Sequence, residues 1–402
     1  MALMSVAEAL ARVLAEAQPL PAGRVELTEA AGRVLAEDLS ALRTQPPADV
    51  SAMDGYAVRG ADVAAAPVAL TVIGEVAAGH PFEGEVKPGE AARIFTGGVM
   101  PAGSDTVVIQ ELAARDGDRV TLQKPTALGR NVRRQGIDFR QGQVLLRKGR
   151  RLTDRDVMLA AAMNHPALPV RRRPKVAVLG TGDELVAPGT APRPGEIVYS
   201  NGFALIALAR NAGAEVHDLG IARDKVDDIA SAVRRASALN ADVLVTTGGA
   251  SVGEHDLVQR ALRAEGLELS FWRVALRPGR PMLHGRLGPM HVLGVPGNPV
   301  SAYVCAFLFL LPLLARLSGC SETGRPLEKA RLGRDLPAND ERQDYLRATL
   351  VLGPDGPVAT PLPDQDSSLM APLSAADCLL IREPFAPTAS SGSPCVILKL
   401  AL

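Results

Sequence analysis

A glycine-rich segment, residues 246–256, combines groups that bind anions with groups that bind cations. Among its residues are three glycines, two hydroxyl residues that can donate to a ligand, and two acids: Gly248, Gly249, Gly253, Thr247, Ser251, Glu254 and Asp256. Glycines let backbone N–H groups approach a ligand and form an anion nest, and the hydroxyls add further donors. The carboxylates are useful there only if a cation accompanies the anion, and Mg2+ takes ligands from one or two carboxylates and from phosphate. The segment therefore predicts a site for phosphate and Mg2+, with a glycine turn and solvated acids as the plainer alternative.

Three further polar segments follow expected strands. They are residues 180–184 (GTGDE), 222–224 (ARD) and 296–299 (PGNP). Ligands of open parallel α/β sheets bind beyond the carboxyl ends of the strands, so these segments should meet the glycine-rich segment at one rim. Asp183 and Glu184 are expected there as metal or ligand contacts, or else as turn and helix caps. Leu185 stands in the place of the third glycine of a dinucleotide fingerprint, so NAD binding is not expected.

Residues 296–299 place the start of a helix at the same rim. Its unpaired N–H groups and the positive end of its dipole favour an oxyanion. Arg273, Arg277 and Arg280 surround Pro278–Gly279 just upstream. Guanidinium groups suit tetrahedral oxyanions such as phosphate or molybdate, so an anion pocket is favoured here over a solvated charged face.

The elements that must position these residues alternate along the chain. Strands are expected at 175–179, 215–219 and 242–247, and helices at about 202–213, at 226–239 and after Asn298–Pro299. This alternation predicts parallel βαβ units with helices on both faces of a sheet. Nearer the N-terminus, helices are expected from Ser5 to about residue 17 with Glu8 completing a capping box, after Thr28, and from Thr153 to about residue 164.

Two other regions are expected to form β structure. Short runs rich in β-branched residues predict strands at 69–76, 91–96, 106–110 and 119–123, and again at 345–352, 378–382 and 395–400. The second group lies between turns rich in proline and glycine, which favours a small β-barrel or sandwich at the C-terminus.

Composition excludes several classes of protein. The 402 residues include 44 Lys and Arg against 44 Asp and Glu, so no overall basic field indicates binding to nucleic acid or to a membrane. The four cysteines show no CxxC spacing and indicate neither a zinc site nor a disulfide framework. The N-terminus lacks the pattern of a signal peptide, and the apolar run 300–314 is shorter than the roughly 20 residues of a membrane span. We expect a cytoplasmic protein in which this run forms a buried helix.

Six motifs occur in order along nearly the whole chain. They are SAMDGYAV at 51–58, RIFTG at 93–97, GID at 136–138, TGDEL at 181–185, GASVGE at 249–254 with Asp256, and PGNPVS at 296–301. The motif at 51–58 would by its spacing alone indicate only a turn. Together, the six resemble the MoeA-type molybdopterin molybdenumtransferases, the family that includes the C-terminal domain of gephyrin.

This resemblance implies a multidomain α/β plus β protein. The implied domains are a small linking domain (1–48 and 137–172), an inserted β domain (49–136), an α/β molybdopterin-binding domain with a parallel sheet (173–320) and a C-terminal β-barrel (321–402). The resemblance also implies a homodimer whose active site lies between the α/β domain of one subunit and other domains of its partner. The implied reaction is Mg2+-dependent insertion of molybdate into adenylated molybdopterin, with release of AMP. A molybdopterin adenylyltransferase and acceptor molybdoenzymes are the implied partners.

The resemblance further assigns roles to individual residues. The implied catalytic positions are Asp54, Thr96, Asp138, Glu184, Asp224 and Asp256, of which the last three are the implied Mg2+ ligands. The implied substrate-binding positions are Thr247, Gly248, Gly249, Ser251, Gly253, Pro296, Gly297, Asn298 and Pro299. Arg277, Arg280, Ser301, Arg347 and Ser367 resemble the set that contacts molybdate. In this interpretation Mg2+ offsets the charge of the pyrophosphate and the arginines hold molybdate until transfer.

The chain departs from the family pattern at several positions. Arg273, Arg277 and Arg280 stand where the family commonly carries lysines, and the two residue types are not interchangeable at close anion contacts. Ala250 replaces a usual valine, and Tyr199 stands where many members have an aspartate.

Three alternatives stay open. One is an enzyme that adenylates molybdopterin, which needs only the α/β domain and not the other motifs. The second is a non-catalytic scaffold that binds partner peptides, which would not need the acids Asp54, Asp138, Glu184, Asp224 and Asp256. The third is insertion of tungstate, which the sequence does not distinguish from insertion of molybdate.

Overall fold

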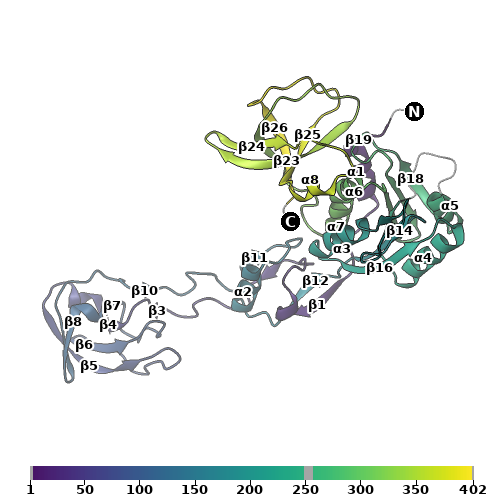
Figure 1. Ribbon diagram of the computed structural model, residues 1–402. Helices are drawn as coiled ribbons and strands as arrows, with labels where there is room; N and C mark the ends of the chain where they lie inside the picture. The colour runs from purple at the N-terminus through teal and green to yellow at the C-terminus, as the bar shows by residue number, and fades with distance from the viewer. Residues whose placement is uncertain (1–2, 249–256, 401–402) are drawn as a thin grey trace.

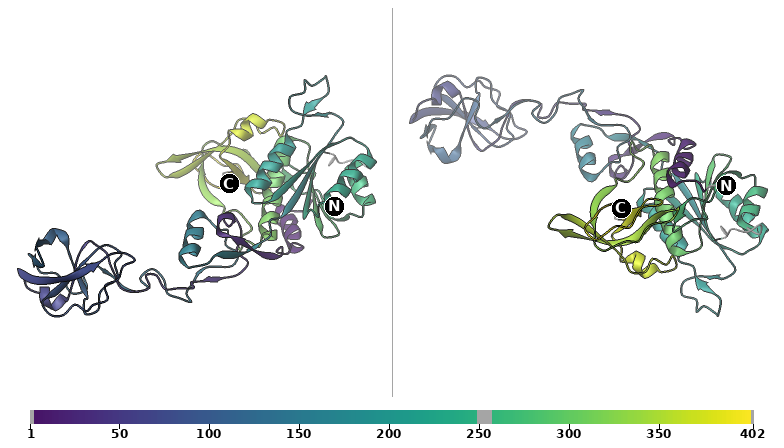
Figure 2. Two further views of the ribbon diagram at one scale, coloured as in Figure 1. Left: turned by 90° about the horizontal axis from the view of Figure 1, so that it is seen from below. Right: turned by 90° about the horizontal axis from the view of Figure 1, so that it is seen from above.

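The computed structural model describes residues 3–248 and 257–400, and the chain is elongated (Figure 1). A body formed by the α/β unit and the C-terminal unit lies at one end, and the inserted β unit lies at the other. A small linking unit and a narrow two-stranded stalk connect them, as the views from below and above also show (Figure 2).

The α/β unit is built on a six-stranded mixed sheet in the order β16–β13–β17–β21–β20–β18. Its strands are β13 (Lys175–Thr181), β16 (Glu215–Ala222), β17 (Val243–Thr247), β18 (Glu268–Trp272), β20 (Leu283–Leu287) and β21 (Met290–Val295). The first three and β21 are parallel, as the alternation of strands and helices predicted. β20 runs antiparallel to both of its neighbours, β21 and β18, which was not predicted from the sequence. A tight turn joins β20 to β21, and only antiparallel strands can be connected so briefly.

Helices cover both faces of this sheet because successive residues of β13 point to opposite sides. Val176 and Val178 pack in one core with α1, α3, α6 and α7, whereas Ala177 and Leu179 pack in the other with α4 and α5. The helices are α1 (Val6–Ala15), α3 (Asn201–Asn211), α4 (Val226–Ala238), α5 (Leu257–Ala264), α6 (Pro299–Cys305) and α7 (Leu311–Leu317). The expected helices near 5–17, 202–213 and 226–239 are thereby confirmed.

A π turn, η4 (Ala306–Leu310), joins α6 and α7 into one apolar helix. The helix Pro299–Leu317 is long and apolar enough to cross a membrane by length and composition, but 83% of its most apolar window is buried inside the protein. Phe307, Phe309 and Leu313 of this helix lie in the larger core of the α/β unit. The expectation of a buried helix is confirmed.

The linking unit is small and contains two short antiparallel pairs and one helix. Its elements are β1 (Ala22–Glu26) with β12 (Ala167–Arg171), β2 (Leu39–Ser40) with β11 (Val144–Leu146), and α2 (Asp154–Ala162). Thr153 and Asp156 form a capping box at the start of α2. The helix expected after Thr28 is wrong, because only a single 3-10 turn, η1 (Leu27–Glu29), forms there. Gly32 has a φ of 75° and donates its N–H to Leu152 O, so the chain turns to pair with a distant segment instead.

The inserted unit is a six-stranded sheet in the order β7–β4–β6–β5–β9–β8. The strands are β4 (Gly55–Val58), β5 (Val68–Val76), β6 (Glu90–Ile94), β7 (Thr106–Ile109), β8 (Ala113–Asp116) and β9 (Arg119–Leu122), with 3-10 turns η2 (Gly60–Val63) and η3 (Gln110–Leu112). Four of these strands match the four predicted between residues 69 and 123. The stalk contains the antiparallel pair β3 (Val50–Ser51) and β10 (Val132–Arg133).

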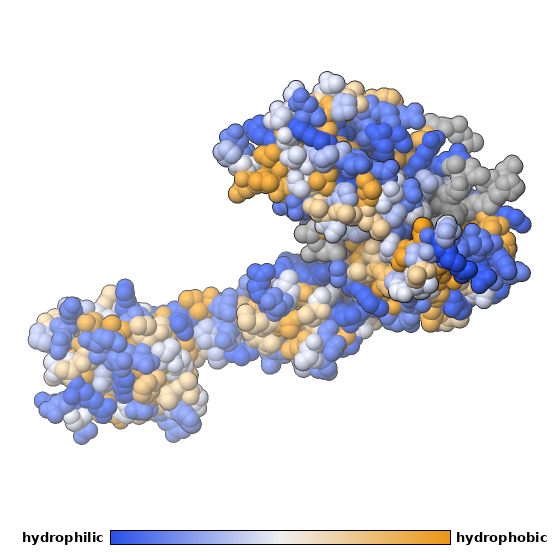
Figure 3. All heavy atoms as spheres, viewed as in Figure 1, coloured by the Kyte–Doolittle hydropathy of each residue, from blue (hydrophilic) through white to orange (hydrophobic). Residues whose placement is uncertain are grey.

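The C-terminal unit is a closed barrel, because β23 pairs with both β24 and β25. Its strands are β22 (Glu328–Leu332), β23 (Gln343–Gly353), β24 (Gly356–Pro361), β25 (Cys378–Arg382) and β26 (Pro394–Lys399), and α8 (Met370–Ser374) precedes β25. β19 (Leu276–Arg277) of the α/β unit pairs in parallel with β23 and so joins the two units. An apolar patch marks the C-terminal unit near the β23–β24 hairpin, where Val351 and Leu352 are exposed (Figure 3).

Candidate active site

A cavity of about 650 Å³ opens beyond the carboxyl ends of β13, β17 and β21. The structure brings these predicted residues together around it: Glu184, Thr247, Gly248, Pro296, Gly297, Asn298, Pro299 and Ser301. The three strands are parallel neighbours, so loops far apart in the sequence meet at one rim.

Short polar contacts hold these loops in register. The Asn201 side chain donates hydrogen bonds from Nδ2 to Thr247 Oγ1 (2.9 Å) and to Gly297 O (2.7 Å), which ties the start of α3 to the other two loops. Gly248 has a φ of 95°, and a Cβ at this position would overlap Thr181 O. Only glycine therefore lets the end of β17 come this close to the end of β13.

Two helices begin at the cavity, α3 after Ser200 and α6 after Asn298. Within the described residues neither of these N-cap side chains makes a capping hydrogen bond. The first N–H groups of a helix have no partner inside the helix and carry its positive dipole end. Both helix starts therefore bring a positive dipole end to the cavity, which suits an anionic ligand. At α6 the N–H of Val300 already donates to Ser367 O (3.0 Å).

The predicted acids divide between the cavity and its edge. Glu184 is exposed and lines the cavity, whereas Asp224 contacts the neighbouring turn through two hydrogen bonds. Asp183 N–H donates to Asp224 Oδ2 (3.4 Å) and Asp224 N–H to Asp183 Oδ1 (3.2 Å). In the glycine-rich segment 246–256, the predicted residues Gly249, Ser251, Gly253 and Asp256 lie outside the described residues.

These acids are compatible with Mg2+ but do not form a complete metal site. Within residues 3–248 and 257–400, no group of three or more His, Cys, Asp or Glu side chains gathers closely enough to hold an ion. Mg2+ usually keeps several waters and uses one or two carboxylates with substrate phosphates. Glu184 at the cavity, with Asp183 and Asp224 beside it, therefore fits an ion that the substrate helps to bind.

Tyr199 is wedged beneath the cavity rim. Its ring packs against Gly180 and Gly202, where any Cβ would collide with it, and its residue is only 4% exposed. Burial raises the pKa of its phenol, so the group stays neutral. Among the described residues its buried hydroxyl has no hydrogen-bond partner. The tyrosine is thus accommodated by two glycines instead of presenting a charge to the cavity.

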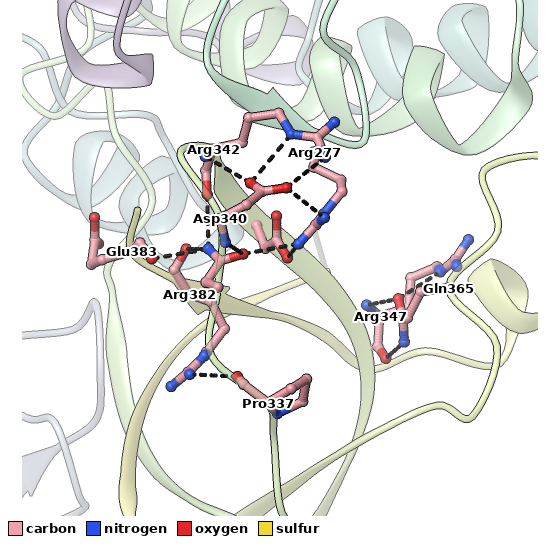
Figure 4. Close-up of polar contacts among 10 residues, drawn as sticks. Arg277, Pro337, Asp340, Arg342, Arg347, Gln365, Arg382 and Glu383 are labelled. Atoms are coloured by element: carbon pink, nitrogen blue, oxygen red, sulfur yellow. Dashed lines mark hydrogen bonds and ion pairs between the residues drawn. The ribbon is translucent and has the colours of Figure 1, made fainter. Parts of the chain in front are cut away.

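Arg277 points into a second cavity at the junction with the barrel and binds acids there (Figure 4). It forms ion pairs with Asp340 (3.0 Å) and Asp344, and donates a hydrogen bond to Asn339 Oδ1 (2.8 Å). Burial raises the pKa of Asp344, and the neighbouring Arg277 opposes that shift. Arg277 therefore joins the α/β unit to the barrel through charges that the chain itself supplies.

Arg347 is likewise occupied by the protein. It is 1% exposed and donates to Gln365 Oε1 (3.3 Å), Asp366 O (2.9 Å) and Asp364 O (3.2 Å) (Figure 4). These bonds hold the loop that leads to Ser367 and α8.

Arg280 differs from both residues because its side chain is exposed. No hydrogen bond or ion pair involves that side chain within the described part of the chain. It precedes Pro281, which lines the larger cavity together with Ser301. Ser367 lies nearby and accepts a hydrogen bond from Asn298 Nδ2 (2.9 Å). The structure thus places Arg280, Ser301 and Ser367 at or beside this cavity.

The remaining predicted residues lie away from the cavity. Thr96 donates to Asp54 Oδ1 from both its N–H and its hydroxyl, each at 2.8 Å, and the backbone bond is the main cause that lowers the pKa of Asp54. Both residues belong to the inserted unit, far along the stalk from the α/β unit (Figure 1). Asp138 is exposed at the other end of the stalk, where its N–H donates to Gln45 O (3.2 Å).

One side of the cavity was not predicted from the sequence. An apolar wall formed by Leu185, Ile197, Val198 and Met370 faces the polar rim. The first three residues belong to β14 (Leu185–Val186) and β15 (Ile197–Val198), a two-residue parallel pair. The apolar pair Ile197–Val198 directly before Tyr199 is the only signal that the sequence offers.

Models of three protein families match this chain in order along its length. Residues 4–164 match the MoeA N-terminal region (domain I and II), residues 177–316 a probable molybdopterin binding domain, and residues 329–400 the MoeA C-terminal region (domain IV).

Relatives of known name and known structure are similar over most of their length. The chain is 37% identical over 337 residues to a molybdopterin molybdenumtransferase of Nostoc sp., covering 82% of this chain and 77% of that protein. It is 34% identical to the protein of the same name from Haemophilus influenzae, covering 93% and 92%. A crystal structure of the molybdopterin biosynthesis MoeA protein from Pyrococcus horikoshii superposes with a TM-score of 0.85 at 30% identity, covering 98% of this chain and 99% of that one.

Proposed function

We propose, because this chain belongs to the family of MoeA-type molybdopterin molybdenumtransferases, that it inserts molybdenum from molybdate into adenylated molybdopterin and releases AMP. Family membership makes the chain a transferase of molybdenum cofactor biosynthesis. The adenylated substrate, the need for Mg2+ and the roles of individual residues are the proposed part.

The observation that carries this proposal is the polar rim of the larger cavity. Two uncapped helix starts, the loop at Thr247–Gly248 and the carboxylate of Glu184 face one space of about 650 Å³. A pyrophosphate needs several N–H and hydroxyl donors and a balancing positive charge, which this rim and a bound cation together provide.

The rim residues bind and orient the phosphates in this proposal. The helix starts at Asn201 and Pro299 face the non-bridging oxygens, and the hydrogen bonds of Asn201 to Thr247 and Gly297 hold these loops in position before the substrate binds. Mg2+ held by Glu184 and the substrate phosphates would offset the negative charge of the pyrophosphate. In the cleavage, a water oxygen forms a new P–O bond to the phosphorus that stays with the pterin while the P–O bond to the AMP phosphate breaks, and the proton of the water passes to solvent. The positive helix ends stabilise the charge left on the departing AMP.

Arg280 and Ser301 are the molybdate contacts that we favour. Arg277 and Arg347 already donate to groups of the protein, and redirecting them would leave Asp344 or the carbonyls of Asp364 and Asp366 without these partners. Arg280 is exposed beside the cavity, so its guanidinium can bind an oxyanion without breaking a contact within the described residues.

We further propose that a second copy of the chain completes the site. Asp54 and Thr96 form a pre-organised pair but belong to a unit at the far end of the stalk (Figure 1). A two-fold symmetric pair of chains lets the inserted unit of one subunit approach the cavity of its partner. This arrangement follows the homodimer that the family resemblance implies.

A complementation experiment tests the shared site. Glu184→Gln and Asp54→Asn are prepared separately, and each is expected to lose at least about 100-fold in turnover if it removes a transition-state contact. Mixing the two variants under conditions of subunit exchange should partly restore activity, because one site of the mixed dimer is then intact. Two inactive variants that stay inactive in a verified mixed dimer would exclude the shared site.

The main experiment measures AMP release and molybdenum incorporation from adenylated molybdopterin, with molybdate and tungstate compared side by side and with Mg2+ present or chelated. Molybdate-dependent AMP release that requires Mg2+ is the expected result. AMP release with tungstate but not with molybdate would mean that the chain inserts tungsten instead of molybdenum. Binding without any AMP release under all conditions would favour the scaffold alternative.

The proposed setting of the reaction is the cytoplasm. There, a molybdopterin adenylyltransferase would supply the substrate and molybdoenzymes would accept the finished cofactor. Co-purification of the chain with a molybdopterin adenylyltransferase, compared between the wild type and a variant with an altered rim, tests the supply step.

A further inference from the structure

The larger cavity has an apolar wall that phosphate binding does not explain. Ile197 and Val198 are 55% and 41% exposed, and Met370 across from them is also exposed. Apolar side chains exposed to water are unfavourable, and a contiguous group beside polar donors is typical of a ligand-binding surface.

The apolar wall is held in place by the backbone. Ile197 N–H donates to Glu184 O (2.8 Å) and Tyr199 N–H donates to Val186 O (2.9 Å), so β15 is fixed against the loop that carries the cavity carboxylate. In Figure 2 this segment projects from the body as a narrow extension. The wall is therefore a fixed surface directly next to the polar rim.

Met370 closes the cavity from the C-terminal unit. Ser200 Oγ donates a hydrogen bond to its Sδ (3.4 Å), which joins the first residue of α8 to the start of α3. A polarizable thioether suits contact with an aromatic ring, and β-branched aliphatic side chains suit the ring's flat face. The wall thus presents apolar groups from two units toward one ligand.

The size of the cavity supports a ligand larger than its anionic groups. A space of about 650 Å³ lies within the range of sites that bury a whole organic molecule. The polar rim accounts for phosphates on one side and leaves the apolar wall facing the remaining space. A molecule that carries a flat heteroaromatic ring next to phosphate matches both sides.

We propose that Leu185, Ile197, Val198 and Met370 bind a flat heteroaromatic ring of the substrate while the rim holds its phosphates. The proposal rests on the proposed function, in which the substrate carries two such rings, an adenine and a pterin. The wall adds affinity and sets the orientation of the phosphates, and it takes no part in breaking bonds.

The test measures binding without turnover. The double variant Ile197→Ser/Val198→Ser keeps both backbone N–H groups and changes only exposed side chains. Its affinities for AMP, for neopterin phosphate and for pyrophosphate are measured by calorimetry without molybdate. The matched control is Val351→Ser/Leu352→Ser, two exposed apolar residues on the barrel hairpin that do not line the cavity.

The expected result is a loss of about tenfold in affinity for one ring-bearing probe, as removal of apolar contact from a bound ring predicts. Pyrophosphate affinity should change less than twofold, and the control variant should bind like the wild type. A loss confined to AMP assigns the wall to the adenine, and a loss confined to neopterin phosphate assigns it to the pterin.

Three results would overturn the proposal: unchanged affinity for both ring-bearing probes, an equal loss for pyrophosphate, or wild-type protein that binds neither ring-bearing probe. Because no metal transfer is measured, these results are separate from failure of the proposed reaction. A chain that transfers no molybdenum but loses AMP affinity in the variant would still have the ring site.

Discussion

The cavity rim and the neighbouring junction with the barrel differ in whether their arginines are paired with other groups of the protein. Arg277 at the junction is paired with Asp340, Asp344 and Asn339, whereas Arg280, three positions later, is exposed beside the cavity. Arg347 in the barrel likewise donates hydrogen bonds to the side chain of Gln365 and to two backbone carbonyls. At the rim, in contrast, two helices begin without a capping side chain, and the buried hydroxyl of Tyr199 has no partner within the described residues.

This difference separates structural charges from charges available to a ligand. Buried polar groups are nearly always hydrogen-bonded in folded proteins, so the ion pairs of Arg277 are explained by the fold alone, although Oδ1 of Asp344 has no partner among the described residues. Donors left open around one cavity need another partner. Residue type and spacing do not distinguish the two cases, because both arginines stand in the same short motif.

The largest expected effect comes from breaking the junction. Arg277→Met should cost about 3 kcal/mol of unfolding free energy, because it leaves the nearly buried carboxylate of Asp344 without its counter-ion. Urea denaturation followed by circular dichroism measures the change. The double variant Arg277→Met/Asp344→Asn should recover most of the loss, since no unpaired charge remains. A single variant as stable as the wild type would show that the pair is not structural.

The rim was predictable from the sequence because its geometry follows from local patterns. Alternating strands and helices predicted parallel strands, and parallel strands bring the loops at Glu184, Thr247 and Pro296 to one edge. The partners of Arg277 lie more than 60 positions away, in another unit, and pair with it only because β19 joins the barrel. No periodicity in the sequence encodes such a contact.

Two other parts of the fold were not predictable for the same reason. The segment after Thr28 has a helix-like composition, but a long-range hydrogen bond from Gly32 to Leu152 draws it into a turn. The position of Asp54 relative to the cavity depends on the direction of the stalk, which no local pattern determines.

The next largest effect is expected from substitution of Arg280, the exposed arginine beside the cavity. Arg280→Met should leave stability within about 0.5 kcal/mol of the wild type, because the side chain is exposed. Its affinity for molybdate should fall about tenfold or more, as loss of a charge-assisted hydrogen bond predicts. Equilibrium binding of molybdate to the wild type, to Arg280→Met and to Arg280→Lys measures this. Unchanged molybdate affinity in the methionine variant would remove Arg280 from the site.

A smaller effect is expected at the hydroxyl of Tyr199. A buried hydroxyl without a partner is unfavourable, so Tyr199→Phe should raise stability by about 1 kcal/mol while the ring keeps its packing against Gly180 and Gly202. Thermal unfolding of the ligand-free protein provides the measurement, with Tyr345→Phe in the barrel as a comparison. A loss of stability in Tyr199→Phe would mean that the hydroxyl has a partner in solution.

The smallest effect is a pH dependence at the junction. Hydrogen bonds from the side chain and the backbone N–H of Arg342, helped by Arg277, lower the pKa of Asp340 from 3.8 to about 2 in the folded protein. A carboxyl whose pKa is lower when folded stabilises the protein above its unfolded pKa, and this contribution disappears as the pH falls through the folded value. The wild type should therefore lose its stability advantage over Asp340→Asn between about pH 4 and pH 2. Asp340 is partly exposed, so the difference is small and screened by salt. Thermal unfolding midpoints of both proteins across this range test the prediction, and parallel curves would show that Asp340 does not pair in solution.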